Sequence, residues 1–376
     1  MKNRSIGWGS LKYVSLLFAV LATGMRMEAK VTESVFGKMP DGTNIQIYTI
    51  EDGLLKARIM TYGARVVSLE VPDRNGKVAD VVLGYDTFLP YTKLPKTFFG
   101  AIVGRYANRI AHGAFPLDGK QYHIVKSEGD NTLHGGMVGF DSHVWQGHIV
   151  PNGVEFTLVS PDGDQGFPGK LTARVRYTLE HNALTIDYSA TTDKDTVVNL
   201  SNHSYFNLAG EGQGDILGNL LTIHADRYTP VDSTLIPTGQ LAPVASTPFD
   251  FRHETEIGAR IHQNNEQLKL GNGYDHNWVL DGKAGELREA ARVYEPKSGR
   301  LLTVQTTQPG LQFYTGNFLD GTAHGKHGHV YQKHAALCLE TQHYPDSPNH
   351  PSFPSTELKP GQTYHNVTVF TFSTRK

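Results

Sequence analysis

The segment LTARVRYTLEHNALTIDYSAT, residues 171–191, decides the fold class of this chain. Every second residue from 171 to 179 is apolar, and the alternation resumes from 183 to 191 after Glu180, His181 and Asn182. Successive side chains of a strand point to opposite faces, so a period of two indicates a strand with one buried face. The segment therefore predicts two antiparallel strands joined by a short turn.

Similar alternating segments follow one another along the chain. Residues 65–71 and 78–85 flank the turn PDRNG, whose Asn-Gly pair is typical of a hairpin. Further strands are predicted at residues 115–117, 122–125, 291–294, 301–306, 311–316, 335–341 and 363–373. Only residues 257–268 have the spacing of a short helix. With no fixed repeat and no linker, the sequence predicts an all-β chain folded as one large antiparallel β-sandwich.

Charge and cysteine content exclude several classes of function. The chain has 376 residues and a formal net charge of -2, from 35 Lys and Arg against 37 Asp and Glu. This balance favours neither nucleic acid nor an anionic membrane surface as a partner. The single cysteine, Cys338, permits no intramolecular disulfide and no thiolate metal cluster.

The N-terminus resembles a targeting segment. Basic residues precede the apolar run YVSLLFAVLATGM, residues 13–25, which is the order of a secretory signal. The run is shorter than the roughly 20 residues of a membrane-spanning helix. We expect residues 1–29 to be a signal peptide, residues 30–376 to form a single domain, and the protein to be periplasmic or secreted. An uncleaved N-terminal anchor is the alternative.

The stretch NLSNHSYFNL, residues 199–208, combines an apolar and a polar pattern. Strand alternation would place Leu200, Phe206 and Leu208 on one face, and His203, Tyr205 and Asn207 on the other. The first face is suited to a core and the second to chemistry. A histidine that only packs and hydrogen bonds is the structural alternative.

Two loops combine polar side chains with glycine. GRYANRIAHG, residues 104–113, contains Asn108 and Arg109, and NTLHGG, residues 131–136, contains His134 before two glycines. Glycines permit close backbone approach, so a ligand could reach His134. Taken alone, the first loop is also typical of a surface arginine and the second of a plain turn.

Two carboxylates lie in unusual surroundings. Asp275 lies in GYDHN, residues 273–277, and could accept hydrogen bonds from adjacent hydroxyls of a polyol, although an Asx turn is the alternative. Glu340 follows the apolar run of residues 335–339, and a buried glutamate is costly unless it is paired or functional. Such carboxylates occur both at functional sites and in structural ion pairs.

The segment HGKHGH, residues 324–329, contains three histidines. Its glycines break any regular ligand spacing, and no carboxylate follows closely. We therefore expect a solvated loop and no metal site.

Six stretches together resemble the aldose 1-epimerase (galactose mutarotase) family: ANRIAHG, NTLHGG, NLSNHSYFNL, GYDHN, PGLQFYTGN and LETQHYPDSPNHPSFPS. They follow the family's order from about Phe36 to the C-terminus. The resemblance implies a galactose mutarotase-like supersandwich without a cofactor, which interconverts the α and β anomers of free aldohexoses such as galactose and glucose. One small departure is Ser201, where the family usually has threonine.

The resemblance also assigns roles to individual residues. The family's general acid falls on His203 and its general base on Glu340. Its sugar-binding groups fall on Asn108, Arg109, His134, Asp275 and Gln312, with Tyr205 beside the acid. Pyranose opening requires one proton to reach the ring oxygen while another leaves the C1 hydroxyl, so an acid and a base suit the reaction.

Two alternatives remain at this stage. A glycoside hydrolase normally uses two carboxyl groups, for which Asp275 could join Glu340. A non-catalytic carbohydrate-binding protein would depend on aromatic platforms, and the chain has only three tryptophans. The epimerase and both alternatives predict a sugar as partner, with no nucleic acid and no membrane insertion of the mature chain. The sequence does not predict the oligomeric state.

Overall fold

A computed structural model describes residues 1–2, 28–94 and 96–376 of the chain. Its first sheet has the order β1-β2-β3-β4-β5, formed by β1 (Lys30–Lys38), β2 (Asn44–Asp52), β3 (Leu55–Met60), β4 (Arg65–Pro72) and β5 (Val78–Asp80). All four pairings in this sheet are antiparallel. The hairpin predicted around the Asn-Gly turn is therefore confirmed as β4 and β5, with a second strand shorter than expected.

The second sheet has nine strands and contains the alternating segment of residues 171–191. In spatial order they are β11 (Gln146–Val150), β12 (Gly153–Ser160), β13 (Leu171–Glu180), β14 (Ala183–Thr192), β27 (Tyr364–Thr374), β23 (Arg300–Thr306), β22 (Arg288–Tyr294), β17 (Leu220–Ile223) and β20 (Thr255–Glu256). Leu179 pairs with Leu184 across the predicted turn. Burial alternates along both strands, so the period of two does mark the core face.

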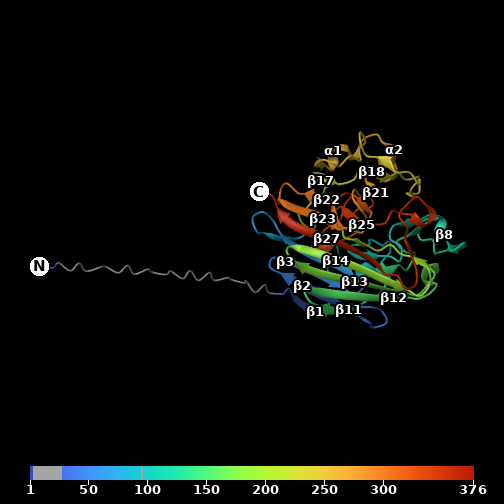
Figure 1. Cartoon of the computed structure of the whole chain (residues 1–376), viewed down its shortest axis with the longest axis horizontal. Helices are drawn as coiled ribbons and strands as arrows, with labels where there is room; N and C mark the ends of the chain where they lie inside the picture. Colours follow the sequence, from blue (N-terminus) through green and yellow to red (C-terminus); the bar gives the residue numbers. More distant parts are fainter. Residues whose placement is uncertain (3–27, 95) are drawn as a thin grey trace.

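The first two sheets pack against each other around one core. Ile50 and Ile59 of the five-stranded sheet belong to the same buried cluster as Phe156, Val175 and Tyr177 of the nine-stranded sheet. In Figure 1 the blue strands β1 to β3 lie beside the green strands β11 to β14. The predicted all-β sandwich is therefore confirmed.

A third sheet has the order β19-β18-β21-β24-β25 and holds much of the site. Its strands are β19 (Ala242–Pro243), β18 (Arg227–Thr229), β21 (Asp275–Val279), β24 (Gly310–Tyr314) and β25 (Cys338–Gln342). One face buries Trp278, Phe313 and Leu339 in the main core. Because strand side chains alternate, their neighbours in sequence project from the opposite face, where the polar residues gather.

Four short antiparallel pairs complete the β structure of the described residues. They are β7 (Arg109–Ile110) with β10 (Thr132–Leu133), β6 (Ala101–Val103) with β16 (Ser201–His203), β8 (Ala114–Leu117) with β9 (Lys120–His123), and β15 (Thr196–Val197) with β26 (Glu357–Leu358). The first two pairs carry site residues. In each of these two pairs, only two or three residue pairings join the strands.

The helix predicted at residues 257–268 is instead two helices, α1 (Gly258–Ile261) and α2 (Glu266–Leu270). Asn265 explains the break. Its backbone is extended, and its side chain accepts hydrogen bonds from the backbone amides of Gln267 and Leu268. An N-cap of this kind starts a new helix rather than continuing an old one.

Within the described part of the chain, no helix has the length and apolar character needed to cross a membrane. Most of the predicted signal peptide, residues 3–27, lies outside the described residues. The prediction of a signal peptide therefore remains a prediction.

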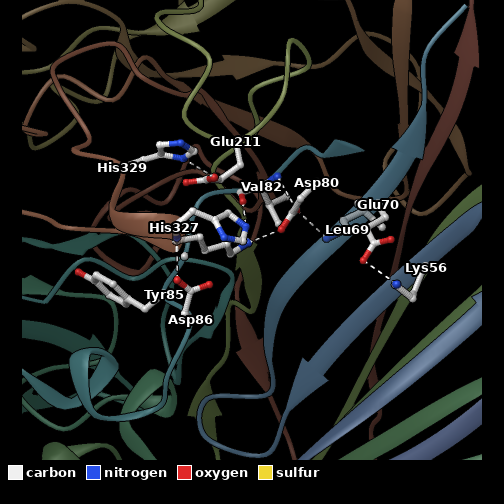
Figure 2. A network of polar contacts seen from close by, with 12 residues as sticks. Lys56, Leu69, Glu70, Asp80, Val82, Tyr85, Asp86, Glu211, His327 and His329 are labelled. Carbon is white, nitrogen blue, oxygen red and sulfur yellow. Dashed lines mark hydrogen bonds and ion pairs between the residues drawn. The ribbon is translucent and has the colours of Figure 1, made fainter. Parts of the chain in front are cut away.

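The histidine-rich segment is more firmly anchored than a solvated loop. Lys326 is buried, and its Nζ donates to Asp80 Oδ2 at 2.6 Å and to the Val82 carbonyl at 2.9 Å. His329 Nδ1 lies 2.8 Å from Glu211 Oε2, as Figure 2 shows. The loop prediction was wrong at Lys326, because the lysine balances the buried carboxylate of Asp80.

Candidate active site

A cavity of about 200 Å³ lies where β16, β25, β21 and the loops around β7 and β10 converge. Seven of the eight residues singled out in the sequence line it: Asn108, Arg109, His134, His203, Tyr205, Asp275 and Glu340. Six further residues complete the wall: Lys96, Phe98, Glu128, Leu133, Tyr314 and Phe318. Gln312 does not line the cavity.

The two proposed proton-transfer groups meet in this cavity. His203 ends the short strand β16, where it pairs with Ala101, and Glu340 lies in the middle of β25. His203 Nε2 lies 3.7 Å from Glu340 Oε1, and both side chains are almost fully buried. The separation exceeds an ordinary hydrogen bond, so both atoms remain able to exchange protons with a bound molecule.

The register of the third sheet places the carboxylates on one face. Asp275 pairs with Tyr314, and Gln312 pairs with Glu340. Tyr314 and Gln312 are two residues apart on β24, so their side chains project from the same face as both carboxylates. The glutamate that interrupts the apolar run is therefore buried at a polar surface of the sheet.

Gln312 lies behind Asp275 in a chain of amide contacts. Its Nε2 donates to Asp275 Oδ1 at 2.7 Å, and its Oε1 accepts from Gln342 Nε2 at 3.3 Å. The resemblance placed Gln312 among the sugar-binding groups. The structure places it where it orients Asp275.

Aromatic rings hold the imidazole of His203. The ring stacks on Tyr205 at 4.9 Å between centroids and 16° between planes, and on Phe98 at 5.8 Å and 19°. Cys338 Sγ lies 3.5 Å from Nδ1. Nδ1 lies next to the thiol, and Nε2 is the nitrogen directed at Glu340.

The strand predicted for residues 199–208 is interrupted after His203, and its polar face is not a single surface. Asn202 donates to the Gly100 carbonyl at 3.0 Å, and Asn207 donates to the Ala335 carbonyl at 2.9 Å. These asparagines satisfy backbone acceptors of neighbouring segments. The placement of Asn207 beside His203 was therefore wrong, whereas Leu200 does lie in the main core as expected.

His134 presents a hydrogen-bond donor to the cavity. Its Nδ1 accepts from the backbone amide of Asn108 at 3.1 Å. A backbone amide can only donate, so Nδ1 carries no proton and the neutral ring has its proton on Nε2. Burial lowers the pKa of His134 well below its usual value, which keeps the ring in this neutral form.

The glycines after His134 serve packing. Gly135 has a φ of 87°, and a Cβ there would lie 2.0 Å from the Gly104 carbonyl oxygen. No side chain fits at that distance. The close backbone approach expected of these glycines is therefore present, but it joins two segments of the chain, and it positions the loop of His134, which lines the cavity, against Arg105.

Ligand atoms of His134, His203 and Glu340 lie within 4.8 Å of one another, so their spacing would suit a metal ion. The hydrogen bond from Asn108 argues against this use. A metal at His134 Nε2 would have to displace the proton that this bond fixes there, because metals bind an unprotonated nitrogen. The donor set fits a polar organic ligand better.

Burial opposes charge on the central pair. It is the largest cause that raises the pKa of Glu340 well above its usual value, followed by the negative charge of Asp275, while Arg109 acts in the opposite direction. Burial lowers the pKa of His203 to about 3. Both shifts favour the uncharged imidazole and the protonated carboxyl. Polar sugar groups that stabilise charge would shift this balance.

One carboxylate oxygen of Glu340 makes no hydrogen bond within the described part of the chain. Among the described residues, Oε2 of Glu340 is buried without a hydrogen-bond partner. A buried acceptor of this kind costs roughly 1–3 kcal/mol when it is unsatisfied. Because Glu340 lines the cavity, a hydroxyl group of a bound molecule would satisfy it.

Several lining residues were missed in the sequence. Glu128 binds Arg109 twice, with Nε to Oε2 at 2.6 Å and Nη2 to Oε1 at 2.8 Å. Phe98 has a positive φ of 56°, and Lys96 lies above its ring. No local pattern marks these residues, because their importance arises only from contacts with distant segments.

Known proteins resemble the chain over most of its length. The sequence profile of the Aldose 1-epimerase family matches residues 46–371. The galactose mutarotase of Homo sapiens is 48% identical over 346 residues, which cover 92% of this chain and 99% of that protein. The aldose 1-epimerase of Escherichia coli strain K12 is 41% identical over 340 residues, which cover 89% and 96%.

Solved structures give the same result. Galactose 1-epimerase from Lactobacillus acidophilus aligns with a TM-score of 0.81 at 29% identity, covering 93% of this chain and 100% of that chain. An aldose epimerase homologue from C. elegans aligns with a TM-score of 0.78 at 34% identity, covering 86% and 96%. From the profile match, these identities and the shared fold, we conclude that the chain belongs to the aldose 1-epimerase family.

Proposed function

We propose that this protein interconverts the α and β anomers of free aldohexoses such as galactose and glucose, with His203 as general acid and Glu340 as general base. The observation that carries the proposal is the approach of His203 Nε2 to Glu340 Oε1 at 3.7 Å in a cavity lined by polar groups. The similar human and Escherichia coli proteins are named galactose mutarotase and aldose 1-epimerase, which supports it.

The reaction needs two coupled proton transfers. Glu340 removes the proton of the C1 hydroxyl while His203 delivers one to the ring oxygen, and the bond between C1 and the ring oxygen breaks. The open aldehyde rotates about its C1–C2 bond, and the ring closes on the opposite face with the two groups reversing roles. The pair regains its starting protonation, so no cofactor or net proton is consumed.

The other polar groups hold the sugar. His134 offers its Nε2 proton, and Arg109 offers a charged donor to oxygens where negative charge develops. Asp275, fixed by Gln312, accepts from hydroxyl groups. Fixing the ring in this way keeps the reacting oxygens near the acid and the base, which is itself a large part of a rate enhancement.

The direct test is polarimetry of freshly dissolved α-glucose and α-galactose. We expect the purified protein to accelerate the decay of optical rotation towards its equilibrium value, in proportion to protein concentration. A decay equal to that in buffer for both sugars would exclude the proposal. Xylose and arabinose assayed in parallel would rank the substrates.

The same preparation tests the alternatives. A glycoside hydrolase would release reducing sugar from a disaccharide, and it would need Asp275 or another carboxyl group to act with Glu340. Asp275 Oδ1 is already bound to Gln312, which favours a binding role. A carbohydrate-binding protein without activity would bind the sugar and leave the rate of anomer exchange unchanged.

We further infer that the protein is exported to the periplasm or the exterior. The basic N-terminus followed by the apolar run of residues 13–25 supports this inference. Expression of the full chain followed by cell fractionation and N-terminal sequencing tests it. We expect a mature chain in the exported fraction that begins near residue 30, and an uncut chain in the cytoplasmic fraction would contradict the inference.

A further inference from the structure

We propose that Glu128 is a positioning residue that fixes the guanidinium of Arg109 towards the sugar and moderates its charge in the cavity. This inference rests on the proposed function and extends it to a residue that no sequence motif marked. Glu128 lines the cavity, and its carboxylate contacts Arg109 through both oxygens.

The pairing restricts Arg109 strongly. The backbone of Arg109 is held by the pairing of β7 with β10, where it lies opposite Leu133. Beyond this point the long side chain has several rotatable bonds, and a bidentate carboxylate selects one orientation among them. The contacts at 2.6 and 2.8 Å are those of charge-assisted hydrogen bonds.

The orientation leaves donors for a ligand. A guanidinium has five N–H groups, and the pairing with Glu128 uses one on Nε and one on Nη2. The side chain of Arg109 is 6% exposed, whereas that of Glu128 is 38% exposed. Glu128 thus contacts the guanidinium from the solvent side. The N–H groups of Arg109 that do not bind Glu128 belong to a buried side chain that lines the cavity.

Glu128 also affects the charges around the base. The positive charge of Arg109 lowers the pKa of both Asp275 and Glu340, and the negative charge of Glu128 raises the pKa of Asp275. Removing the Glu128 charge would therefore leave Arg109 less neutralised, and the ionised carboxylates would become more stable.

Two lysines near this unit are already paired, and the carboxylates besides Glu128 that interact with Arg109 are Asp275 and Glu340. Lys96, on another part of the wall, lies 3.1 Å from Asp141 Oδ2. Lys126 and Asp130, in the same turn as Glu128, pair with each other at 2.9 Å. Substituting Glu128 therefore leaves the positive charge of Arg109 less neutralised without freeing an opposite charge elsewhere in the turn.

The test compares Glu128→Gln and Glu128→Ala with the wild type in full kinetics and in calorimetric binding of galactose. We expect KM and the dissociation constant to rise about tenfold in Glu128→Ala, because a positioned charged donor is lost, with kcat changed less. We also expect the alkaline limb of the pH profile of both variants to move to lower pH, since their carboxylates ionise more readily.

A matched control is available on the surface. Glu155 pairs with Arg176 through Nε at 3.1 Å and Nη2 at 2.7 Å, away from the cavity. Glu155→Gln should leave KM, sugar binding and the pH profile as in the wild type. Thermal unfolding of each variant checks that the fold is retained.

The outcomes separate this inference from the proposed function. If the wild type does not accelerate anomer exchange, the proposed function fails, and galactose binding still reports on the positioning of Arg109. If the wild type is active while both Glu128 variants keep its KM, its sugar affinity and its alkaline limb, the positioning role is overturned. A purely structural role would lower thermal stability without moving the pH profile.

Discussion

Glu340→Gln is expected to lower kcat for anomer exchange by about 10³-fold, within the range of 10²–10⁴ that general acid–base catalysis contributes. The amide keeps the shape of the side chain in β25, but it cannot accept the proton of the C1 hydroxyl. Sugar binding should change little, because the amide oxygen can still accept a hydrogen bond. Polarimetry at saturating galactose measures the effect.

The pH profile gives a second signature of the same group. Burial raises the pKa of Glu340, so the carboxylate is protonated at pH values at which an ordinary glutamate is ionised. Proton transfer needs Glu340 ionised and His203 protonated, and burial lowers the pKa of His203 to about 3, so the pair shares a single proton between the two pKa values. The rate should be level in this range and fall as pH rises through the raised pKa of Glu340, which forms the alkaline limb of the profile. Glu340→Gln should abolish that limb. A variant with wild-type kcat and limb would remove Glu340 from the mechanism.

His203→Gln is expected to lower kcat by a similar factor, about 10²–10⁴-fold. Glutamine fills part of the space between Phe98 and Tyr205 and can hydrogen bond, but it cannot deliver a proton to the ring oxygen. The double variant with Glu340→Gln should be hardly slower than either single variant, because an acid and a base that act in one step are not additive.

A matched His–Glu pair outside the cavity serves as control for both substitutions. His224 Nε2 lies 2.8 Å from Glu289 Oε1, with both side chains partly exposed. His224→Gln and Glu289→Gln remove a similar contact without reaching the site, and we expect kcat to stay within about twofold of the wild type, as for most surface changes. A His203→Gln variant that retained more than a tenth of the wild-type kcat would assign the acid role to another group.

Local sequence patterns predicted the elements of the fold. The alternation in residues 171–191 predicted β13 and β14 with the correct turn, because a strand at the surface of a core repeats every two residues. The apolar run of residues 335–339 marked Glu340 as a buried carboxylate, because so polar a group is costly in a core. Family motifs added His203 and the sugar-binding candidates.

Other features could not be read from the sequence. The strand ends after His203, and the asparagines on either side of this end donate to the backbone carbonyls of Gly100 and Ala335, which are distant in the sequence. Two further contacts join segments that share no local pattern. They are the tight contact of Gly135 with Gly104 and the bidentate contact of Glu128 with Arg109. The placement of Gln312 behind Asp275 depends on the register of β21 and β24.

The sequence alone determined many of the strands, their apolar faces and the polar side chains that interrupt them, because these properties depend on neighbours within a few positions. Tertiary structure alone decided that an imidazole on β16 and a carboxylate on β25 approach to 3.7 Å, and which groups orient them. Proton transfer requires contact distances between specific atoms, and those distances are set by the pairing of strands that lie far apart along the chain.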